Sequence, residues 1–339
     1  MTYDRAFYRK LAETARRSAR RIIPSVLAQV APKSVIDVGC GTGSWLAEFA
    51  NNGIVDLCGV DGDFFPADML EIPREQFVAF DLIRPYTCNR RFDLVVSLEV
   101  AEHLPADCAE QFVDSLVQLG PTVLFSAAIP GQGGTHHVNE QWQDYWADLF
   151  GERDYVPVDC VRKSVWDDAE VAWWYAQNML LYCERRHAIA NPALAREIEY
   201  SRSLPLRIVH PRKLDEVIWR ERWRRAAHEL ARAIGHGTTF FLVDDAATGD
   251  AFASCGQMVP FPQKDGVFSG SPADSNSAIA GMRLLWSSAS HLVAVEPAFW
   301  WFSHYADWFT FLQANSRSVL ETKDMRVFEL LPLPHEQGG

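Results

Sequence analysis

Five short apolar or β-branched runs in the first half of the chain constrain its fold more than any other feature. They occupy residues 34–39, 55–60, 77–81, 92–98 and 121–127, and the stretches between them are long enough to hold helices. This alternation is typical of a parallel sheet built from strand–helix–strand units. The sequence therefore predicts an α/β fold in which helices cover both faces of a Rossmann-like sheet.

The second half of the chain predicts a further, smaller α/β domain. The chain has 339 residues, more than one compact domain usually holds. We expect a first domain over residues 1–200, closed by a helix over residues 166–182, then a connector over residues 201–212 and a second domain over residues 213–339. The elements expected in the second domain are helices over residues 213–234 and 277–287 and strands over residues 239–243, 291–296, 318–321 and 326–330. We assign this domain to substrate recognition or dimerisation, so a homodimer is compatible with the sequence.

Composition and charge disfavour several classes of protein. The formal net charge of −12 disfavours nucleic acid as a partner, because nonspecific affinity for it comes from clustered Lys and Arg. The seven cysteines include no C-x-x-C pair, which argues against a disulfide framework and a thiolate zinc site. No uncharged apolar run reaches the ~18 residues that a membrane helix needs, and the N-terminus lacks the features of a secretory signal. We therefore expect a cytoplasmic protein without a membrane span.

A glycine-rich loop follows the first predicted strand. Residues 37–43 read Asp-Val-Gly-Cys-Gly-Thr-Gly, and glycines there let the backbone turn sharply and approach a ligand closely. The dinucleotide pattern G-x-G-x-x-G fails, because its last position falls on Ser44 when counted from Gly39 and on Leu46 when counted from Gly41. No lysine follows the glycines, so the loop is not a P-loop either.

Two acidic residues follow the next predicted strands. Asp61 comes at the end of the second strand, close to the distance at which a carboxylate can accept hydrogen bonds from ribose hydroxyls. Asp81 and Leu82 come at the end of the third strand, where a carboxylate beside apolar side chains suits an adenine amino group. The ordered set of glycine loop and acidic residues is more specific than the glycines alone.

This ordered series resembles the class I S-adenosylmethionine-dependent methyltransferases over roughly residues 30–150. The resemblance implies that the glycine loop runs past the methionine part of the cofactor and that Asp37 supports the loop. It also implies that Asp61 binds the ribose and that Asp81 lies by the adenine. The predicted cofactor-binding residues are Asp37, Gly39, Gly41, Gly43, Asp61, Asp81, Leu82 and Glu99.

Histidines near the ends of the fourth and fifth strands are the candidate catalytic groups. Transfer of a methyl group to a hydroxyl requires positioning of the reactants and a base for the proton. His136 and His137 follow glycines in the loop after the fifth strand, and a neutral imidazole can accept that proton. We predict that one of these two is the general base, and His103 is the third catalytic candidate.

A short acidic motif leaves a divalent metal as an alternative cofactor. Glu99-x-x-Glu102-His103 is expected to begin a helix, so the two glutamates would share a face and could bind Mg²⁺ or Mn²⁺ with a histidine of the next loop. The motif resembles the metal-binding set of the small-RNA 3′-terminal ribose methyltransferases. It also occurs in ubiquinone-type O-methyltransferases and in many class I members for which no metal is implied. We therefore assign no metal ligand.

The predicted activity is O-methylation of a small-molecule acceptor, either a sugar or glycan or a secondary metabolite. Residues 127–183, rich in Trp and Tyr, resemble a bacterial branch of this superfamily that is associated with modification of such compounds. Two alternatives stay open. One is a metal-dependent 2′-O-methyltransferase of RNA 3′-terminal ribose, and the other is a non-catalytic module that only binds S-adenosylmethionine.

Overall fold

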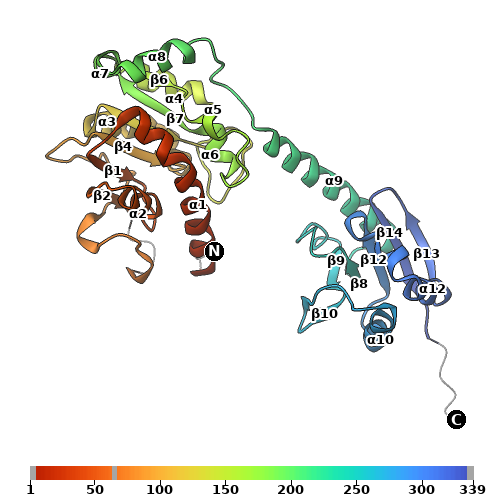
Figure 1. Cartoon of the computed structure of the whole chain (residues 1–339). Helices are drawn as coiled ribbons and strands as arrows, with labels where there is room; N and C mark the ends of the chain where they lie inside the picture. The colour runs from red at the N-terminus through yellow and green to blue at the C-terminus, as the bar shows by residue number, and fades with distance from the viewer. Residues whose placement is uncertain (1–4, 63–66, 334–339) are drawn as a thin grey trace. The chain divides into compact units, whose positions relative to one another are not determined.

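The computed structural model describes residues 5–62 and 67–333. It divides the chain into two compact units, Met1–Leu214 and Asp215–Gly339 (Figure 1). The long helix α9, Pro211–Ile234, carries the chain from one unit into the other. None of the helices in the described part of the chain has the length and apolar character required to cross a membrane.

A seven-stranded sheet forms the core of the N-terminal unit. Its strands are β1 Ser34–Val38, β2 Asp56–Asp61, β3 Phe77–Ala79, β4 Leu94–Leu98, β5 Thr122–Ser126, β6 Tyr155–Val158 and β7 Leu180–Glu184. Their order is β3-β2-β1-β4-β5-β7-β6, with β1 to β5 parallel and β7 antiparallel to both of its neighbours. Each of the five predicted runs overlaps one of the strands β1 to β5, so the predicted parallel sheet is confirmed.

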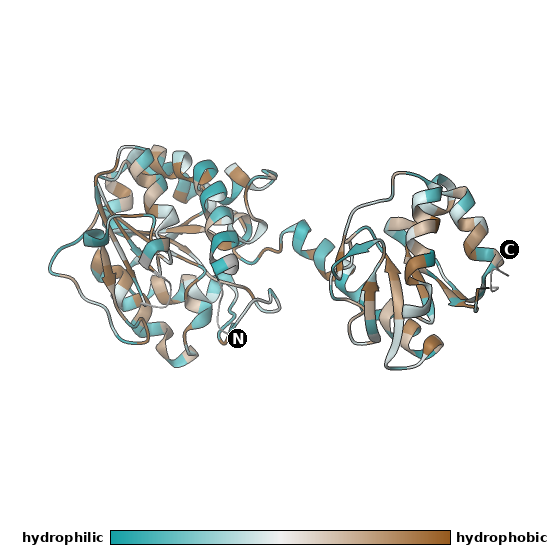
Figure 2. Cartoon of the chain, turned by 90° about the horizontal axis from the view of Figure 1, so that it is seen from below, coloured by the Kyte–Doolittle hydropathy of each residue, from teal (hydrophilic) through white to brown (hydrophobic). Residues whose placement is uncertain are grey.

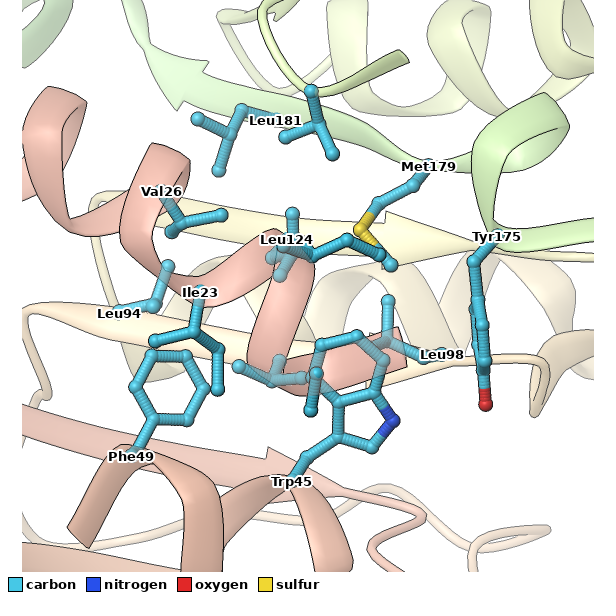
Figure 3. Packing of buried hydrophobic residues seen from close by; sticks show 14 of the residues in the cluster. Ile23, Val26, Trp45, Phe49, Leu94, Leu98, Leu124, Tyr175, Met179 and Leu181 are labelled. Carbon is cyan, nitrogen blue, oxygen red and sulfur yellow. The ribbon is translucent and has the colours of Figure 1, made fainter. Parts of the chain in front are cut away.

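Helices cover both faces of this sheet. They are α1 Arg5–Val30, α2 Ser44–Asn51, α3 Ala109–Leu119, α4 Gln143–Gly151, α5 Arg162–Val165, α6 Trp173–Asn178, α7 Arg185–Ala190 and α8 Pro192–Ser201. Because successive strand residues point to opposite faces, Val35 packs into the cluster with α1 and α2, and Ile36 packs into the cluster with α3 and α4. Figure 3 shows Ile23 of α1 and Phe49 of α2 beside Leu94 of β4. The predicted fold class is confirmed.

The last strands of this unit differ from the prediction of a helix over residues 166–182. Helix α6 covers only Trp173–Asn178, and β7 begins directly after Met179. Residues 180–183 are buried on both faces of the sheet, between β5 and β6. A continuous apolar run of this kind fits a buried strand as well as a helix, so the helical interpretation was wrong.

The C-terminal unit contains a smaller, five-stranded sheet in the order β13-β14-β12-β8-β9. Its strands are β8 Thr238–Val243, β9 Gly256–Pro260, β12 His291–Val295, β13 Ser316–Glu321 and β14 Met325–Leu330, and a separate hairpin is formed by β10 Gln263–Lys264 and β11 Val267–Phe268. β8 pairs in parallel with β9 and β12, and β14 pairs antiparallel with β12 and β13. The predicted smaller α/β domain is confirmed, although β9 and the hairpin were not predicted.

Helices also cover both faces of the smaller sheet. Trp223 and Leu230 of α9 pack with Phe240, and α10 Ser275–Leu285 and α12 Ala306–Ala314 pack on the opposite face with α11 Trp301–His304. Figure 2 shows apolar colouring along the strands of this unit and mixed colouring on its helices.

The described residues also form short 3-10 helices in both units. They are η1 Ala67–Met69, η2 Arg74–Gln76, η3 Ala101–His103, η4 Ala106–Cys108, η5 Trp286–Ser288 and η6 Glu296–Ala298.

Candidate functional site

The glycine loop, residues 39–43, joins the end of β1 to the start of α2. Gly39 and Gly43 have φ of +88° and +85°, a conformation that residues with a side chain rarely adopt. A Cβ at Gly39 would lie 2.2 Å from Val100 Cγ2, so the chain after β4 passes directly against the loop. A Cβ at Gly41 would meet no described atom within 4 Å, which leaves this side of the loop open to a ligand.

Asp61, the last residue of β2, is hydrogen-bonded to this loop. Its Oδ2 accepts a hydrogen bond of 2.6 Å from Gly41 N, and its Oδ1 accepts one of 2.6 Å from Gly62 N. Burial raises the pKa of the Asp61 carboxyl, although the two hydrogen bonds oppose that shift. The carboxyl of Asp37, buried in β1, has a pKa well above its usual range because of its burial and the nearby Asp61. Both aspartates therefore lie at the glycine loop.

Asp81 and Leu82 lie at the same edge of the sheet. Phe80 N donates a hydrogen bond of 2.8 Å to Asp61 O, which places the chain after β3 beside the end of β2. Asp81 is exposed and its Oδ1 accepts a hydrogen bond of 3.1 Å from Ile83 N, whereas Leu82 is half-buried. Both residues therefore directly follow a residue that contacts Asp61. They lie in a turn, and the Asp81 carboxylate faces solvent.

Glu71, which sequence analysis missed, holds the glycine loop from the other side. Its backbone N donates to Thr42 O at 2.7 Å, and its Oε1 accepts a hydrogen bond of 2.8 Å from Ser44 Oγ. Arg16 of α1 forms an ion pair of 3.0 Å with the same carboxylate. A single glutamate between two short 3-10 helices carries no motif, so only the structure identifies this contact.

Glu99 follows β4 in a left-handed conformation, with φ of +55°. The expected helix start at Glu99 is therefore wrong: the 3-10 helix η3 begins two residues later, because a helix cannot start through a residue in this conformation. The carboxylate of Glu99 accepts hydrogen bonds from Gln132 Nε2 at 2.9 Å and from Asn178 Nδ2 at 3.2 Å. Burial raises its pKa, and these bonds oppose the shift.

Glu102, His103 and His137 form a compact cluster. One ligand-type atom of each residue lies within 4.8 Å of the others, and the rings of the two histidines are 4.8 Å apart between centroids. Glu102 is fully buried, and neither carboxylate oxygen has a hydrogen-bond partner among the described residues. Burial and the nearby Glu99 raise its pKa well above the usual range. Burial and His137 lower the pKa of His103, which favours the neutral imidazole.

The loop after β5 distinguishes the two candidate base histidines. His137 is half-buried, and its Nδ1 lies 3.0 Å from Glu140 Oε1. The side chain of His136 is exposed, and its backbone has φ of +60°. Glu140 also accepts hydrogen bonds from Gly131 N at 2.7 Å and Gly133 N at 2.9 Å, so one carboxylate organises the loop and contacts His137.

Comparison with known proteins identifies the larger unit. Residues 11–158 match the model of a family described as "Methyltransferase domain", and this segment contains the glycine loop, Asp61 and the histidine loop. The N-terminal unit therefore contains a domain of this methyltransferase family. The methyltransferase unit is thus an enzyme that transfers methyl groups.

Several solved methyltransferase structures are similar to the chain. One is an O-methyltransferase family protein from Burkholderia thailandensis, with 14% identity and a TM-score of 0.40 over 53% of this chain and 58% of that chain. Another is the methyltransferase domain of bacterial CtHen1, with 18% identity and a TM-score of 0.34 over 49% of this chain and 98% of that domain. A third is magnesium protoporphyrin IX methyltransferase from Synechocystis, with 16% identity and a TM-score of 0.37 over 52% and 85% of the two chains. No curated protein matches the sequence.

A buried amide network supports Glu99 in the methyltransferase unit, and sequence analysis missed it. Gln132 Oε1 accepts hydrogen bonds from Asn178 Nδ2 at 2.9 Å and from Gln177 Nε2 at 3.3 Å. The backbone O of Gln132 accepts a hydrogen bond of 2.7 Å from Nζ of Lys213, which is buried in the first turn of α9. Gln177 and Asn178 end a segment rich in Trp and Tyr, and nothing in the sequence marks these amides as a network.

The raised pKa of Asp37 predicts a pH-dependent effect on stability. Because its folded-state pKa lies above the unfolded value of about 3.9, its contribution to folding is fully present below about pH 4 and is lost as the pH rises through the folded-state value. We expect Asp37→Asn to raise the midpoint of thermal unfolding relative to wild type, and to raise it more at pH 8 than at pH 5. The measurement is thermal unfolding by circular dichroism at both values.

The matched control is Asp56→Asn at the start of β2. The hydrogen bond from Arg90 lowers the pKa of Asp56, so this substitution is expected to lower stability slightly at pH 8, in the opposite direction. A shift for Asp37→Asn that is the same at pH 5 and pH 8 would contradict the account of Asp37.

Proposed function

We propose that the protein methylates a hydroxyl group of a small-molecule acceptor, a sugar or glycan or a secondary metabolite, with His137 as general base. The contact of 3.0 Å between His137 Nδ1 and Glu140 carries this proposal. A base that is oriented by a carboxylate is the usual arrangement for accepting a proton from a hydroxyl nucleophile. His136 is exposed, and His103 lies against His137 and shapes its surroundings.

The cofactor site is assigned to the residues around the glycine loop. The open side of Gly41 suits the approach of a ligand, and the Asp61 carboxylate has acceptor capacity beyond its two amide donors. The residues proposed to hold the cofactor are Asp37, Gly39, Gly41, Gly43, Asp61, Asp81, Leu82 and Glu99. S-adenosylmethionine, when bound, supplies an electrophilic methyl group on a sulfonium.

The chain's own groups then handle the acceptor and its proton. With its Nδ1 hydrogen-bonded to Glu140, His137 offers Nε2 to accept the proton of the acceptor hydroxyl, and the bound cofactor would supply the methyl group. Glu140 fixes the tautomer of His137 and stabilises the imidazolium that forms. The Gln132 and Asn178 amides hold Glu99 in place beside this site.

Incubation of the full chain with isotope-labelled S-adenosylmethionine and a panel of sugars and secondary metabolites tests the proposal. The expected result is an acceptor that gains one labelled methyl group on oxygen, detected by mass spectrometry. Transfer only to RNA 3′ ends, or binding of the cofactor without transfer to any acceptor, would contradict it and favour the two alternatives named above.

A second candidate is a metal-dependent methyltransferase, for which the buried Glu102 carboxylate is the specific support. A fully buried carboxylate without a hydrogen bond is costly, and a divalent cation bound by Glu102, His103 and His137 would compensate it. Such a cation would polarise the acceptor hydroxyl, so His137 would be a ligand and not the base.

Added Mn²⁺ distinguishes the two candidates. If the cluster binds metal, saturating Mn²⁺ is expected to raise the midpoint of thermal unfolding of wild type by about 5 °C. The midpoint of Glu102→Gln should be the same with and without Mn²⁺. His136→Ala is the control, because His136 is outside the cluster, and it should keep the wild-type response. Equal midpoints with and without Mn²⁺ in wild type, together with full turnover in excess chelator, would remove the metal-dependent candidate.

We assign the C-terminal unit to recognition of the acceptor or to dimerisation. Its sheet has the open α/β architecture that commonly binds ligands at the carboxyl ends of its parallel strands.

A further inference from the structure

The carboxyl ends of β8 and β12 meet at the centre of the smaller sheet. Figure 1 shows these two strands side by side, and they pair in parallel from Phe240 and His291 onward. The chain leaves β8 toward β9 on one side and later returns to β12 on the other side of β8. Ligands of open α/β sheets bind outside the carboxyl ends of strands at such a reversal.

The turn after β8 holds a strained backbone at this position. Asp245 and Ala246 have φ of +51° and +58°, and consecutive residues with side chains rarely adopt this conformation. The buried Asp244 keeps the turn in place, because its carboxylate accepts hydrogen bonds from Ala246 N at 3.0 Å and from Thr248 Oγ1 at 2.6 Å. Strain that the surroundings impose in this way is commonly found at binding sites.

This turn presents one carboxylate to two tryptophans that follow β12. Asp245 Oδ2 accepts a hydrogen bond of 2.7 Å from Trp300 Nε1, and Oδ1 accepts one of 3.0 Å from Trp301 Nε1. Trp301 is fully buried, whereas 42% of Trp300 is exposed. The exposed His304 lies 5.3 Å from Trp300 between ring centroids. Both indoles therefore hold the turn, and the partly exposed Trp300 lies beside a preset carboxylate.

We propose that this surface, formed by Asp245, Trp300 and His304, is a binding site for a neutral sugar. The exposed indole provides an apolar face on which the C–H groups of a sugar ring can stack. Asp245 keeps acceptor capacity for sugar hydroxyls, and its hydrogen-bond partners among the described residues are the two neutral indoles. An unneutralised carboxylate at this place disfavours an anionic ligand. This binding would give the C-terminal unit the recognition role proposed above, and it involves none of the residues proposed for methyl transfer.

A glycan array probed with the labelled full chain, without added cofactor, tests the proposal. We expect wild type to bind at least one neutral monosaccharide or oligosaccharide, and Trp300→Ala to bind it at least about tenfold more weakly in a titration followed by tryptophan fluorescence. The matched control is Trp219→Ala, which removes a tryptophan of similar exposure, 40% against 42%, from α9 and should bind as wild type does.

The Trp300→Phe variant distinguishes the stacking of the ring on a sugar from the hydrogen bond that Trp300 donates to the turn. Phenylalanine keeps an aromatic face but cannot donate to Asp245, so it should retain more affinity for the sugar than Trp300→Ala if the ring face binds. This variant also decides the question if Trp300→Ala unfolds. The proposal is overturned if wild type binds none of the neutral glycans, including the case in which it binds only a cation such as choline. It is also overturned if Trp300→Ala and Trp300→Phe both bind the sugar as tightly as wild type does. Failure of this site would leave the methyl-transfer test unaffected, because that test detects product at the other unit.

Discussion

Replacing Asp61 with alanine is expected to lower the affinity for S-adenosylmethionine by about 10- to 100-fold. The substitution removes the acceptor for Gly41 N and Gly62 N, so the glycine loop loses its link to β2. It also removes the carboxylate that we assign to the ribose hydroxyls. Isothermal titration calorimetry with the full chain measures the affinity directly and does not require knowledge of the acceptor.

Asp56→Ala is the matched control for Asp61→Ala. Asp56 begins the same strand at its other end, where it forms an ion pair of 2.6 Å with Arg90, and its removal should leave cofactor affinity unchanged. Wild-type affinity in Asp61→Ala would refute the placement of the cofactor site.

Replacing His137 with alanine is expected to lower kcat by about 10²- to 10⁴-fold, the range that a general base contributes. Cofactor affinity should stay at the wild-type value, because His137 contacts Glu140 and His103 and lies outside the glycine loop. The acceptor found in the labelled-cofactor screen serves as substrate, and initial rates give kcat and KM separately.

His136→Ala is the neighbouring control, because its side chain is exposed while that of His137 is half-buried. We expect its kcat to remain within a few-fold of wild type. The kcat of Glu140→Gln should lie between those of the two histidine variants, because the glutamine cannot stabilise the imidazolium. If both histidine variants turned over at the wild-type rate, or lost the same amount, His137 would not be the base.

The elements that sequence predicted well are those whose signal is local. Val35 and Ile36 alternate between two buried faces of β1, and the glycines and Asp61 follow in a fixed order along successive strands. The run over residues 180–183 failed as a prediction, because a strand buried on both faces has no alternation that would separate it from a helix.

The polar contacts around the site were not predictable for a different reason. Gln132 meets Asn178, which lies 46 residues further along the chain, and Glu99 meets Asn178 across 79 residues. Neither pair has a sequence spacing that a helix or a hairpin would impose, so only tertiary packing brings them together. The distinction between His136 and His137 likewise depends on the path of the loop around Glu140.

The hydrogen bond from Lys213 to Gln132 O determines where a self-sufficient catalytic fragment can end. The family match stops at residue 158, before β7 fills the sheet between β5 and β6. A fragment that ends there would expose the edge of β5. A fragment that ends at residue 200 would still lack Lys213, which donates the hydrogen bond to the backbone of Gln132. Limited proteolysis of the intact protein should therefore release a stable, cofactor-binding fragment only when cleavage falls beyond the first turn of α9.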